Sequence, residues 1–452
     1  MKILFIAPLP PPVHGSAMVS QYIKDSRLVN EQYDCDFVNL STSRRMDEIG
    51  KGGIKKILRF IGAYLCLLWK LLTRRYDLCY LAITCHDMGF LKDAPFVLLC
   101  KLFRRRVLIH QHNKGMSGCV ERWPYRWLLP LVYRNTRVML LSWHLYDDIA
   151  AVVKREQVVV CANGIPQQSC DENEDENENE NCLAGNINLT QNTQNSQNNI
   201  LECEDQQDLN TKTQNLQVAA PLLASGVSAI NEDDNDNSQE LRAKSQELRA
   251  NGQQPTTNSQ QPKANSQAPT AKILFLSNLI PSKGVYVLLD ACKVLKERGL
   301  QFVCDFVGGE TKEIDRAAFE AAVKERDLEG IVCYHGPKYG EEKEEYWRRA
   351  DVFVQPTFDD CFPLTLVEAM QHRLPIVSTD VGAIPDMIKE EVNGFICPQR
   401  DVDSLVTALE KLITDPVLRQ QMGEQGYQRY QEELTLEAFE RRFVAELKAV
   451  GC

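Results

Sequence analysis

The sequence predicts an α/β protein with two doubly wound, Rossmann-like domains and a polar insertion between them. Short apolar runs alternate with helical patterns near both ends of the chain, as expected for parallel βαβ units. The opening run KILFIA at Lys2–Ala7 is similar in sequence to KILFLS at Lys272–Ser277. At 452 residues the chain is long enough for two or three domains, each with its own core.

The first domain is predicted over residues 1–166. Six apolar runs are its candidate strands: Ile3–Ala7, Cys35–Leu40, Leu78–Ala82, Val107–His110, Val138–Ser142 and Val158–Ala162. Several are apolar at every position, which is the pattern of strands buried on both faces of a sheet. The chain begins like a short signal peptide, but prolines from Pro8 onward interrupt the apolar run. We therefore expect a buried first strand and no secretion signal.

The insertion is predicted over residues 167–271. Residues 171–181 contain only Asp, Glu and Asn, and the remainder is rich in Gln, Asn, Ser and Thr. The hexapeptide SQELRA occurs at 238–243 and again at 245–250. Such a segment has too little apolar side chain to offset its ordering entropy, so we expect a disordered linker, with or without a biochemical role.

The second domain is predicted over residues 272–435, followed by a C-terminal helix over 436–452. After Lys272–Ser277 its candidate strands are Phe302–Val307, Ile331–Tyr334, Val352–Gln355, Ile376–Ser378 and Gly394–Cys397. The last helix is rich in charged residues. It is predicted to be amphipathic, because the apolar residues Phe439, Phe443 and Leu447 recur at a spacing of four. Two such domains leave a ligand cleft between the carboxyl ends of their sheets.

Charge and cysteine content limit the classes of partner. Residues 1–166 have 24 Lys and Arg against 13 Asp and Glu, a net charge of +11, whereas residues 167–452 have a net charge of −22. The basic first part indicates either an anionic partner or simply a solvated surface. No pair of cysteines has zinc spacing, and Cys66, Cys79, Cys100, Cys161, Cys304 and Cys333 lie singly in apolar patterns. We expect buried free thiols, a cytoplasmic protein and no nucleic-acid partner.

The segment Pro356–Met370 (PTFDDCFPLTLVEAM) contains the most informative motif. It follows a candidate strand and begins a helix, with Pro363 suited to the first helical turn. The free backbone N–H groups of Leu364 and Thr365 would then form a site for a diphosphate. Asp360 on the loop and Glu368 on the helix can flank that site and accept hydrogen bonds from sugar hydroxyls. The alternative interpretation is an ordinary structural helix with an acidic N-terminus and one buried, capped glutamate.

This segment resembles the donor-binding signature of retaining glycosyltransferases of family 4, which have the GT-B fold of two Rossmann-like domains facing a cleft. The family has Glu, seven residues and Glu, where this sequence has Asp360 and Glu368. The resemblance continues through residues 371–386 and 393–395 and extends over both domains, about 350 residues. It implies that Asp360 and Glu368 act in catalysis and that Phe362, Leu364 and Thr365 contact the donor.

Two further loops of the second domain resemble the family. The sequence NLIPSKG ends in Lys283 and Gly284 and is similar to the phosphate-holding loop, which usually has Arg at the position of Asn278. Lys283 would neutralise the donor diphosphate and the charge that develops on the leaving group. Gly309, in a Gly-Gly-Glu turn after the next strand, corresponds to the family's glycine turn, although an ordinary strand-to-helix turn has the same sequence.

The first domain contributes three resembling positions. Gly15, in the loop after the first strand, corresponds to a glycine that lets the backbone approach a ligand. His112, two residues after His110, fits the family's histidine near the transferred sugar, where a neutral imidazole can donate to a hydroxyl or shuttle a proton. An ordinary surface histidine is the alternative. The segment Asn163-Gly-Ile resembles the family's Asn-Gly-Ile/Val sequence at the end of the first domain, and we expect it to have a structural role.

The resemblance implies a reaction and its partners. A nucleoside diphosphate sugar, with UDP or GDP as the nucleotide, donates its glycosyl group with retained configuration to a glycan or lipid-linked acceptor. No Asp-x-Asp motif ends a candidate cleft strand, and the family needs no metal, so neither a metal nor another cofactor is expected. The acceptor hydroxyl attacks from the leaving-group side, which lets the β-phosphate take its proton.

The acceptor is expected on the first domain, where Phe60–Trp69 lies among basic residues. Lys55, Lys56, Arg59, Lys70 and Arg74 flank this run, which is too short to span a bilayer. A basic, aromatic-flanked helix favours peripheral contact with an anionic membrane, at the inner face of the cytoplasmic membrane. A core helix of the sheet layer is the alternative. The remaining rival functions are a GT-B sugar-nucleotide epimerase and a non-catalytic nucleotide-sugar-binding protein.

Overall fold

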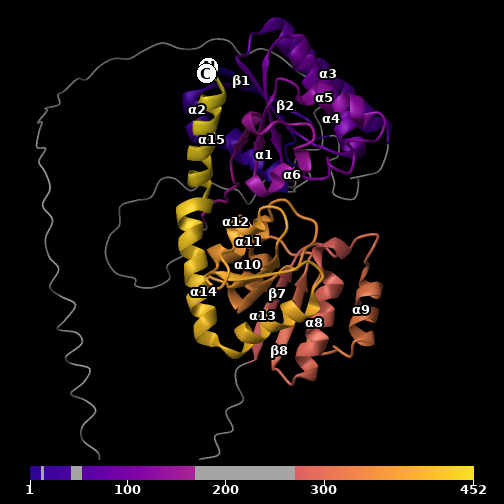
Figure 1. The fold of residues 1–452 in the computed structure, drawn as a ribbon, viewed down its shortest axis with the longest axis vertical. Coiled ribbons are helices and arrows are strands. Elements are labelled where there is room, and N and C mark those ends of the chain that lie inside the picture. Colours follow the sequence, from indigo (N-terminus) through magenta and orange to yellow (C-terminus); the bar gives the residue numbers. More distant parts are fainter. Residues whose placement is uncertain (12–14, 42–52, 168–269, 452) are drawn as a thin grey trace, which may run out of the picture. The chain divides into compact units, whose positions relative to one another are not determined.

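The computed structural model describes residues 1–11, 15–41, 53–167 and 270–451, which belong to one compact unit. Most of the segment predicted to be a disordered linker, 167–271, lies outside the described residues. The same holds for residues 12–14 of the proline-rich loop before Gly15. Two six-stranded sheets, both entirely parallel, form the described part of the chain, as predicted (Figure 1).

The first sheet has the order β2-β1-β3-β4-β5-β6. Its strands are β1 (Lys2–Ala7), β2 (Asp34–Asn39), β3 (Leu78–Ile83), β4 (Arg106–Gln111), β5 (Arg137–Leu140) and β6 (Val158–Val160). All six runs predicted from sequence are strands. Successive side chains of a strand point to opposite faces of the sheet. In β1, Leu4 and Ile6 accordingly belong to one hydrophobic cluster, and Ile3 and Phe5 belong to another.

Helices cover both faces of this sheet. One layer contains α3 (Ile54–Thr73), α4 (Asp87–Leu102) and α5 (Tyr125–Tyr133), and the other contains α1 (Gly15–Asp25) and α2 (Arg27–Gln32). A short helix, α6 (Tyr146–Ile149), follows β5. The described helices include none that is both long and apolar enough to cross a membrane.

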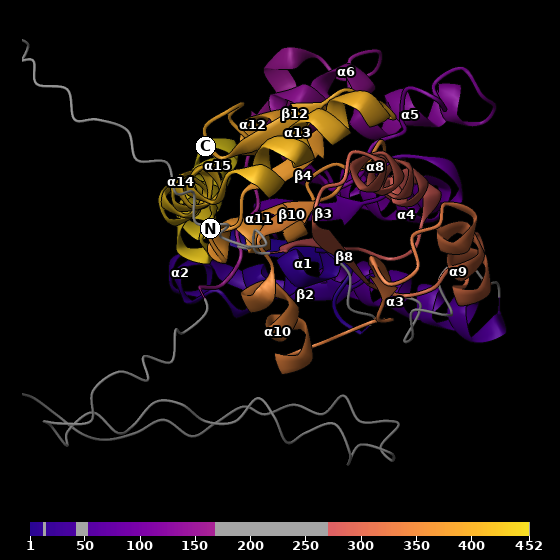
Figure 2. The same cartoon turned by 90° about the horizontal axis from the view of Figure 1, so that it is seen from below.

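The second sheet has the order β12-β11-β10-β7-β8-β9. Its strands are β7 (Ala271–Leu276), β8 (Phe302–Val307), β9 (Val332–Tyr334), β10 (Val352–Val354), β11 (Ile376–Thr379) and β12 (Gly394–Cys397). One face packs on α8 (Val285–Glu297), α9 (Arg316–Glu325) and α13 (Val402–Thr414), and α8 and α13 lie side by side (Figures 1 and 2). The other face packs on α10 (Glu341–Arg349), α11 (Leu364–Gln371) and α12 (Ile384–Met387).

The last helix, α15 (Leu436–Gly451), packs on the first domain although it follows the second in sequence. It is reached through α14 (Pro416–Arg429) and the π-helical segment Tyr430–Leu434. Phe439, Phe443 and Leu447 are buried in the cluster that also contains β1 and β3, and α15 lies beside α2 in Figure 1. The amphipathic pattern therefore correctly identified the buried face of this helix.

The chain returns from the second domain to the first at Thr435, beside the Asn163-Gly-Ile segment. The Ile165 N–H donates to Leu434 O at 3.0 Å, and the Leu436 N–H donates back to Ile165 O at 2.8 Å. A Cβ atom on Gly164 would stand 2.2 Å from Thr435 O, so only glycine fits here. These contacts support the structural role predicted for the segment.

The cysteines are free thiols throughout the described residues. Cys79, Cys100, Cys161 and Cys304 are buried, as predicted. The prediction is wrong for Cys66 and Cys333, which are exposed. Cys66 lies on α3, whose outer face is apolar and yet open to solvent, so an apolar sequence pattern did not indicate burial at that position.

Candidate functional site

The N-terminus of α11 lies at the carboxyl edge of the second sheet, directly after β10. Pro363 is the N-cap of this helix with extended backbone, so the expected place of Pro363 in the first turn is off by one residue. Its carbonyl accepts a hydrogen bond from the Leu366 N–H at 3.1 Å. The N–H groups of Leu364 and Thr365 come earlier and have no acceptor within the helix, which makes this end a suitable anion site.

A buried glutamine fixes the first turn of α11. The Thr365 hydroxyl lies 2.6 Å from Oε1 of Gln355, the residue that follows β10 and is only 2 % exposed. The helix N-terminus is therefore held against the end of its own strand. The sequence predicted Gln355 only as the last residue of a strand, without a role in the site.

Lys283 meets this helix from the loop after β7. The residues Pro281–Lys283 form a 3₁₀ turn that ends at Gly284 with φ of 84°. A Cβ atom on Gly284 would lie 2.1 Å from Pro356 O, so glycine lets the two loops touch. Lys283 Nζ lies 2.5 Å from Asp360 Oδ2 and 3.1 Å from Asp359 O. The two predicted site residues Lys283 and Asp360 are thus brought together as an ion pair.

Asn278 and Gly309 are also brought together. The Gly309 N–H donates to Asn278 Oδ1 at 2.9 Å, which ties the loop after β8 to the loop after β7. A short amide side chain makes this contact where the resembled family has arginine. Asn278 therefore connects these two loops through a neutral hydrogen bond.

Glu368 lies on α11, one turn beyond the helix start. Its carboxylate pairs with Lys343 of α10 at 2.7 Å, and both side chains are less than a quarter exposed. Burial raises the pKa of the Tyr22 hydroxyl on α1, and the Glu368 carboxylate raises it further. Glu368 is thus paired with Lys343, and its charge acts on Tyr22 of the first domain; neither Lys343 nor Tyr22 was predicted from the sequence.

The first domain approaches the same loops through its own carboxyl edge. Gly15 begins α1, and a Cβ built on it would lie 3.9 Å from Leu364 Cδ1. His112 follows β4 and is half-buried, with its ring centroid 4.0 Å from that of His110. Two residues further on, Lys114 Nζ lies 3.5 Å from Asp359 Oδ1. Gly15 and the His112 loop therefore face the second domain's site loops.

A second contact between the domains lies beside α12. Asp386 accepts hydrogen bonds from the Ser142 hydroxyl, and His144 Nε2 lies 3.2 Å from Asp386 Oδ1. Together with the pair of Lys114 and Asp359, it links the two carboxyl edges. Of these polar residues, Asp386 lies on α12 and His144 on the short 3₁₀ turn Trp143–Leu145, and the others lie on loops; sequence periodicity gives no signal for such lone polar residues.

Phe362 differs from the other predicted donor contacts. Its side chain is only 7 % exposed and belongs to the hydrophobic core cluster. Any contact it makes with a ligand in this arrangement would use its backbone. The remaining candidates lie at the carboxyl edges of the two sheets. Glu368 is one turn inside α11, and the others occupy loops or helix ends: Gly15, His112, Asn278, Lys283, Gly284, Gly309, Asp360, Leu364 and Thr365.

The acidic side chains of the site are all paired with lysines. Three carboxylates, Asp359, Asp360 and Glu368, each lie within 3.5 Å of a lysine ammonium group. A bound diphosphate would compete with Asp359 and Asp360 for Lys114 and Lys283. The site is therefore suited to exchange internal ion pairs for contacts with an anionic ligand.

His110, beside His112, is a fully buried titratable group. Its Nδ1 lies 2.7 Å from the Tyr80 hydroxyl, and burial, followed by the charge of His112, lowers its pKa well below the usual value. The folded protein therefore keeps His110 neutral at a pH at which the unfolded chain binds a proton.

This difference predicts a pH dependence of stability. Below about pH 6.5 the His110 contribution should lower the free energy of unfolding by up to about 1.4 kcal/mol per pH unit, and above that pH it should be constant. Urea unfolding of the wild type and of His110→Asn across this range measures the effect. The variant should show the shallower pH dependence; equal slopes would contradict the buried neutral state.

One group of possible metal ligands lies away from this site. Asp305, Cys333 and His335 place one ligand atom each within 4.8 Å of one another. However, Asp305 already contacts His335 Nε2 at 2.6 Å and Arg349 at 2.8 Å. The guanidinium supplies the positive charge that a metal would bring, so we interpret the group as a charge network.

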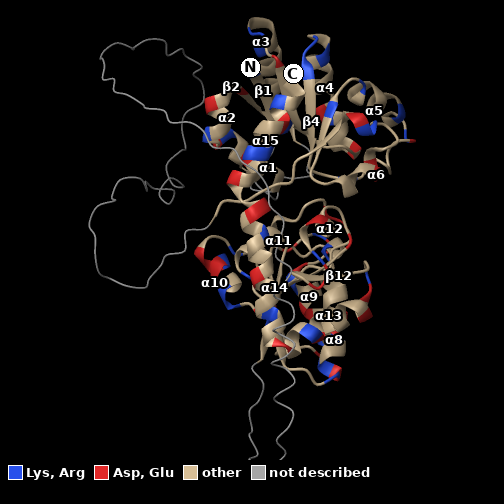
Figure 3. Ribbon diagram, turned by 60° about the vertical axis from the view of Figure 1, so that its left-hand side comes forward, with Lys and Arg blue, Asp and Glu red and all other residues tan. Residues whose placement is uncertain are grey.

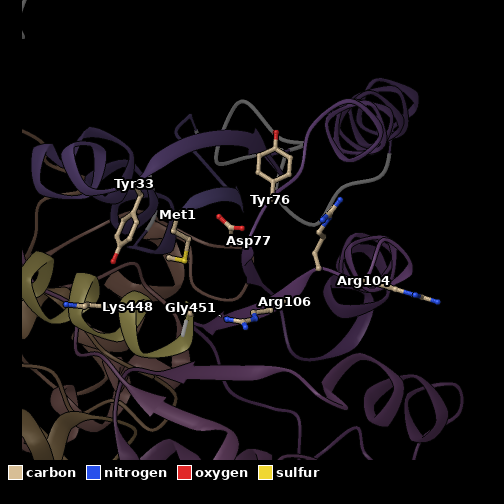
Figure 4. A pocket seen from close by; sticks show the side chains of 9 residues that line it. Met1, Tyr33, Tyr76, Asp77, Arg104, Arg106, Lys448 and Gly451 are labelled. Atoms are coloured by element: carbon tan, nitrogen blue, oxygen red, sulfur yellow. Dashed lines mark hydrogen bonds between the residues drawn. The ribbon is translucent and has the colours of Figure 1, made fainter.

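A pocket of about 560 Å³ lies at the opposite edge of the first sheet (Figure 4). Met1 and Arg106, at the amino ends of β1 and β4, line it together with Lys448 and Gly451 of α15. Ligands of parallel α/β sheets bind at the carboxyl ends of the strands. This pocket is therefore separate from the candidate site.

Comparison with known proteins agrees with this geometry. Residues 256–429 match the family model described as Glycosyl transferases group 1. The amylovoran biosynthesis glycosyltransferase AmsK of Erwinia amylovora is 33 % identical over 147 residues, 31 % of this chain and 35 % of AmsK. The putative colanic acid biosynthesis glycosyltransferase WcaL of Escherichia coli is 29 % identical over 153 residues, 32 % of this chain and 37 % of WcaL. The match spans about a third of each relative's length.

Solved structures extend the similarity to both domains. Sucrose-phosphate synthase from Thermosynechococcus elongatus superimposes with a TM-score of 0.62 at 14 % identity, over 99 % of this chain and 98 % of that one. HepE from Anabaena, in complex with UDP, gives 0.62 at 14 % identity over 99 % and 100 % of the two chains. Its complex with UDP-glucose gives 0.60, also at 14 % identity and with the same coverage. The chain therefore has a GT-B fold, and within it residues 256–429 are similar to Glycosyl transferases group 1.

Proposed function

We propose that this protein is a glycosyltransferase that moves a sugar from a nucleoside diphosphate sugar to a glycan or lipid-linked acceptor with retained configuration. The observation that supports this most directly is the convergence of Lys283, the α11 N-terminus and Glu368 at one sheet edge. A cation, free N–H groups and a carboxylate are what a diphosphate and a sugar require. The match of this region to Glycosyl transferases group 1 supports the same conclusion.

The donor is proposed to be a UDP- or GDP-sugar. HepE, which shares the fold, has been seen with UDP and with UDP-glucose. In our proposal the diphosphate lies against the N–H groups of Leu364 and Thr365, with Lys283 on its oxygens. Asp360 and Glu368 then accept hydrogen bonds from the hydroxyls of the donor.

The reaction breaks the bond between the anomeric carbon and the β-phosphate oxygen and forms one to the acceptor oxygen on the same face of the sugar. The acceptor proton passes to the departing β-phosphate, with no metal or other cofactor involved. Lys283 and the helix N-terminus stabilise the negative charge on the leaving group. His112 is placed beside the transferred sugar, where a neutral imidazole can donate to a hydroxyl.

The acceptor is proposed to be a cell-surface polysaccharide precursor or a lipid-linked glycan. AmsK is described as an amylovoran biosynthesis glycosyltransferase, and WcaL as a putative colanic acid biosynthesis glycosyltransferase. We place the protein in the cytoplasm, at the inner face of the cytoplasmic membrane. Contact with the membrane would use a surface of the first domain other than the candidate site.

A donor screen tests this function. The true donor, at about 100 times its Kd, should stabilise the fold by about 2.7 kcal/mol in a thermal-shift series of UDP- and GDP-sugars. Labelled sugar should then move to a glycan in EDTA, with the donor's anomeric configuration retained by NMR. Glu368→Gln should bind the donor but lose most of this transfer.

The outcomes separate the rival functions. Isomerised free donor without transfer would identify an epimerase. Donor binding without hydrolysis or transfer would identify a binding protein, the alternative suggested by Asn278 and Asp360. Inverted configuration, or transfer abolished by EDTA and restored by Mg²⁺, would contradict the proposed mechanism.

A further inference from the structure

The outer face of the α3–α4–α5 layer exposes an unusual number of large apolar side chains. Seven of them lie on α3 alone, each 45–75 % exposed: Ile54, Ile57, Leu58, Ile61, Leu65, Trp69 and Leu72. Their spacing of three or four residues places them along one side of the helix. We call the exposed apolar residues of these three helices and their flanking turns the apolar face.

The opposite side of α3 is an ordinary core surface. Leu67 and Leu71 are buried against the sheet, and Phe60 and Tyr64 pack at their edge on Phe96 of α4. The two interpretations of Phe60–Trp69 left open by the sequence thus apply to different sides of one helix. Core packing explains the buried side only, so the exposed side needs a partner of its own.

The neighbouring helices continue the apolar face. Trp123, Trp127 and Leu131, on and just before α5, are 81, 69 and 55 % exposed at a spacing of four. Leu102, at the end of α4, is 75 % exposed. Three of the five tryptophans of the chain therefore lie on this layer with most of their surface in water. Amphipathic rings of this kind favour the boundary between lipid and water.

The charges on the layer are mainly positive. The sequence of α3 contains four basic residues and no acidic one, and α5 contains Arg126 and no acidic residue. Figure 3 shows Lys and Arg along α3, at the end of α4 and beside α5. Arg104, after α4, lies at the rim of the pocket in Figure 4, and the end of its side chain extends outward. Apolar side chains ringed by cations match a surface that is apolar inside and anionic outside.

We propose that the apolar face docks on an anionic lipid bilayer, with α3 lying in the plane of the interface. A second copy of the chain is a poorer occupant, because two basic faces repel each other. Tryptophan and leucine would enter the acyl boundary while Lys55, Arg104 and Arg126 meet the lipid phosphates. Each such cation near an anionic surface strengthens binding about fivefold.

Docking on a membrane would bring the enzyme to a lipid-linked acceptor, and this role of the docking rests on the proposed function. A pocket of about 640 Å³ lies between α3 and the carboxyl end of β2, lined by residues that include Arg59, Gly62, Asn39 and Ser41. One wall of this pocket is the helix that docks, and the opposite wall belongs to the sheet edge that faces the candidate site. A lipid-linked acceptor held in the bilayer would thus lie close to the carboxyl edge of the first sheet.

The test uses the full-length protein with vesicles of phosphatidylglycerol and phosphatidylcholine, and with phosphatidylcholine alone. We expect flotation with the anionic vesicles, a blue shift of tryptophan fluorescence and weaker binding at high salt. The double variant Leu65→Glu/Trp69→Glu should reduce binding at least tenfold. The matched control Tyr339→Glu/Val417→Glu changes exposed apolar residues of the second domain, 75 and 62 % exposed, and should bind like the wild type.

Two results would overturn the proposal: wild-type protein that stays in solution with anionic vesicles at low salt, or an α3 variant that floats as well as the wild type. Self-association that the same variant abolishes, without vesicle binding, would assign the face to a second copy instead. Donor-induced thermal shifts confirm that each variant is folded. Vesicle binding without sugar transfer would contradict the proposed function alone, and transfer to a soluble acceptor without vesicle binding would contradict the docking alone.

Discussion

Lys283→Ala should lower kcat/KM for the donor about 10²–10³-fold. The variant lacks a fixed positive charge at the place where negative charge develops on the leaving group. The structure suggests an additional effect. Lys283 Nζ lies 2.5 Å from Asp360 Oδ2, and the two side chains are only 20 and 17 % exposed. Without the lysine, an unpaired carboxylate would face the expected position of the diphosphate and repel it.

A double variant separates these two effects. Lys283→Ala/Asp360→Ala should recover part of the donor affinity lost by Lys283→Ala, because the repelling carboxylate is gone. Donor Kd is the appropriate measurement, since Asp360 is itself a candidate catalytic residue and its loss lowers kcat. Lys338→Ala is the matched control, because it also breaks a partly exposed lysine–carboxylate pair in this domain, with Glu342.

The control should bind the donor like the wild type. If Lys283→Ala also binds it with unchanged affinity, the diphosphate does not lie at this loop and the site assignment is wrong. If affinity falls equally in the single and double variants, the Asp360 charge does not face the ligand.

The sequence predicted the strands well, for a physical reason. A strand buried on both faces must be apolar at nearly every position, and the runs around Leu78–Ala82 and Val352–Gln355 have this property. Parallel strands end at one edge, so motifs that follow them had to lie together. The roles of Lys283, Asp360 and Glu368 came from the resemblance of their segments to the family, and the parallel sheet explains why these segments lie at one edge.

The ion-pair partners could not be predicted in the same way. Lys343 and Lys114 meet Glu368 and Asp359 through contacts between segments far apart in the chain, and a lone lysine in a helix or loop has no distinctive spacing. Cys66 shows the related limit of apolar patterns. An apolar helix surface that faces solvent has the same residues as one that faces a core, so sequence alone could not separate the two sides of α3.

The partner of the last helix is another feature beyond the sequence. Phe439, Phe443 and Leu447 predicted an apolar face, and periodicity does not say which domain covers it. The structure shows that the first domain does, because α15 completes the helical layer that α1 and α2 leave open. The first domain is therefore built from two chain segments separated by the whole of the second domain.

This arrangement predicts a large stability effect in the first domain from a change near the C-terminus. Phe443 is fully buried, with its ring centroid 5.6 Å from Tyr80 of β3 and 5.5 Å from Phe439. Phe443→Ala should lower the free energy of unfolding by about 3–5 kcal/mol, through lost apolar burial and the cavity left behind. The exposed Arg441 on the same helix, replaced by Ala, should have an effect within about 0.5 kcal/mol.

Hydrogen exchange shows where the effect falls. In Phe443→Ala the amides of β1, β3 and β4 should lose protection, while those of β7 and β8 should change less, since their cluster contains no residue of α15. Weakening confined to the second sheet would contradict the packing. Because β4 leads directly to the His112 loop, loosening the first sheet should also lower transfer activity in this variant, without any change to a residue that contacts the donor.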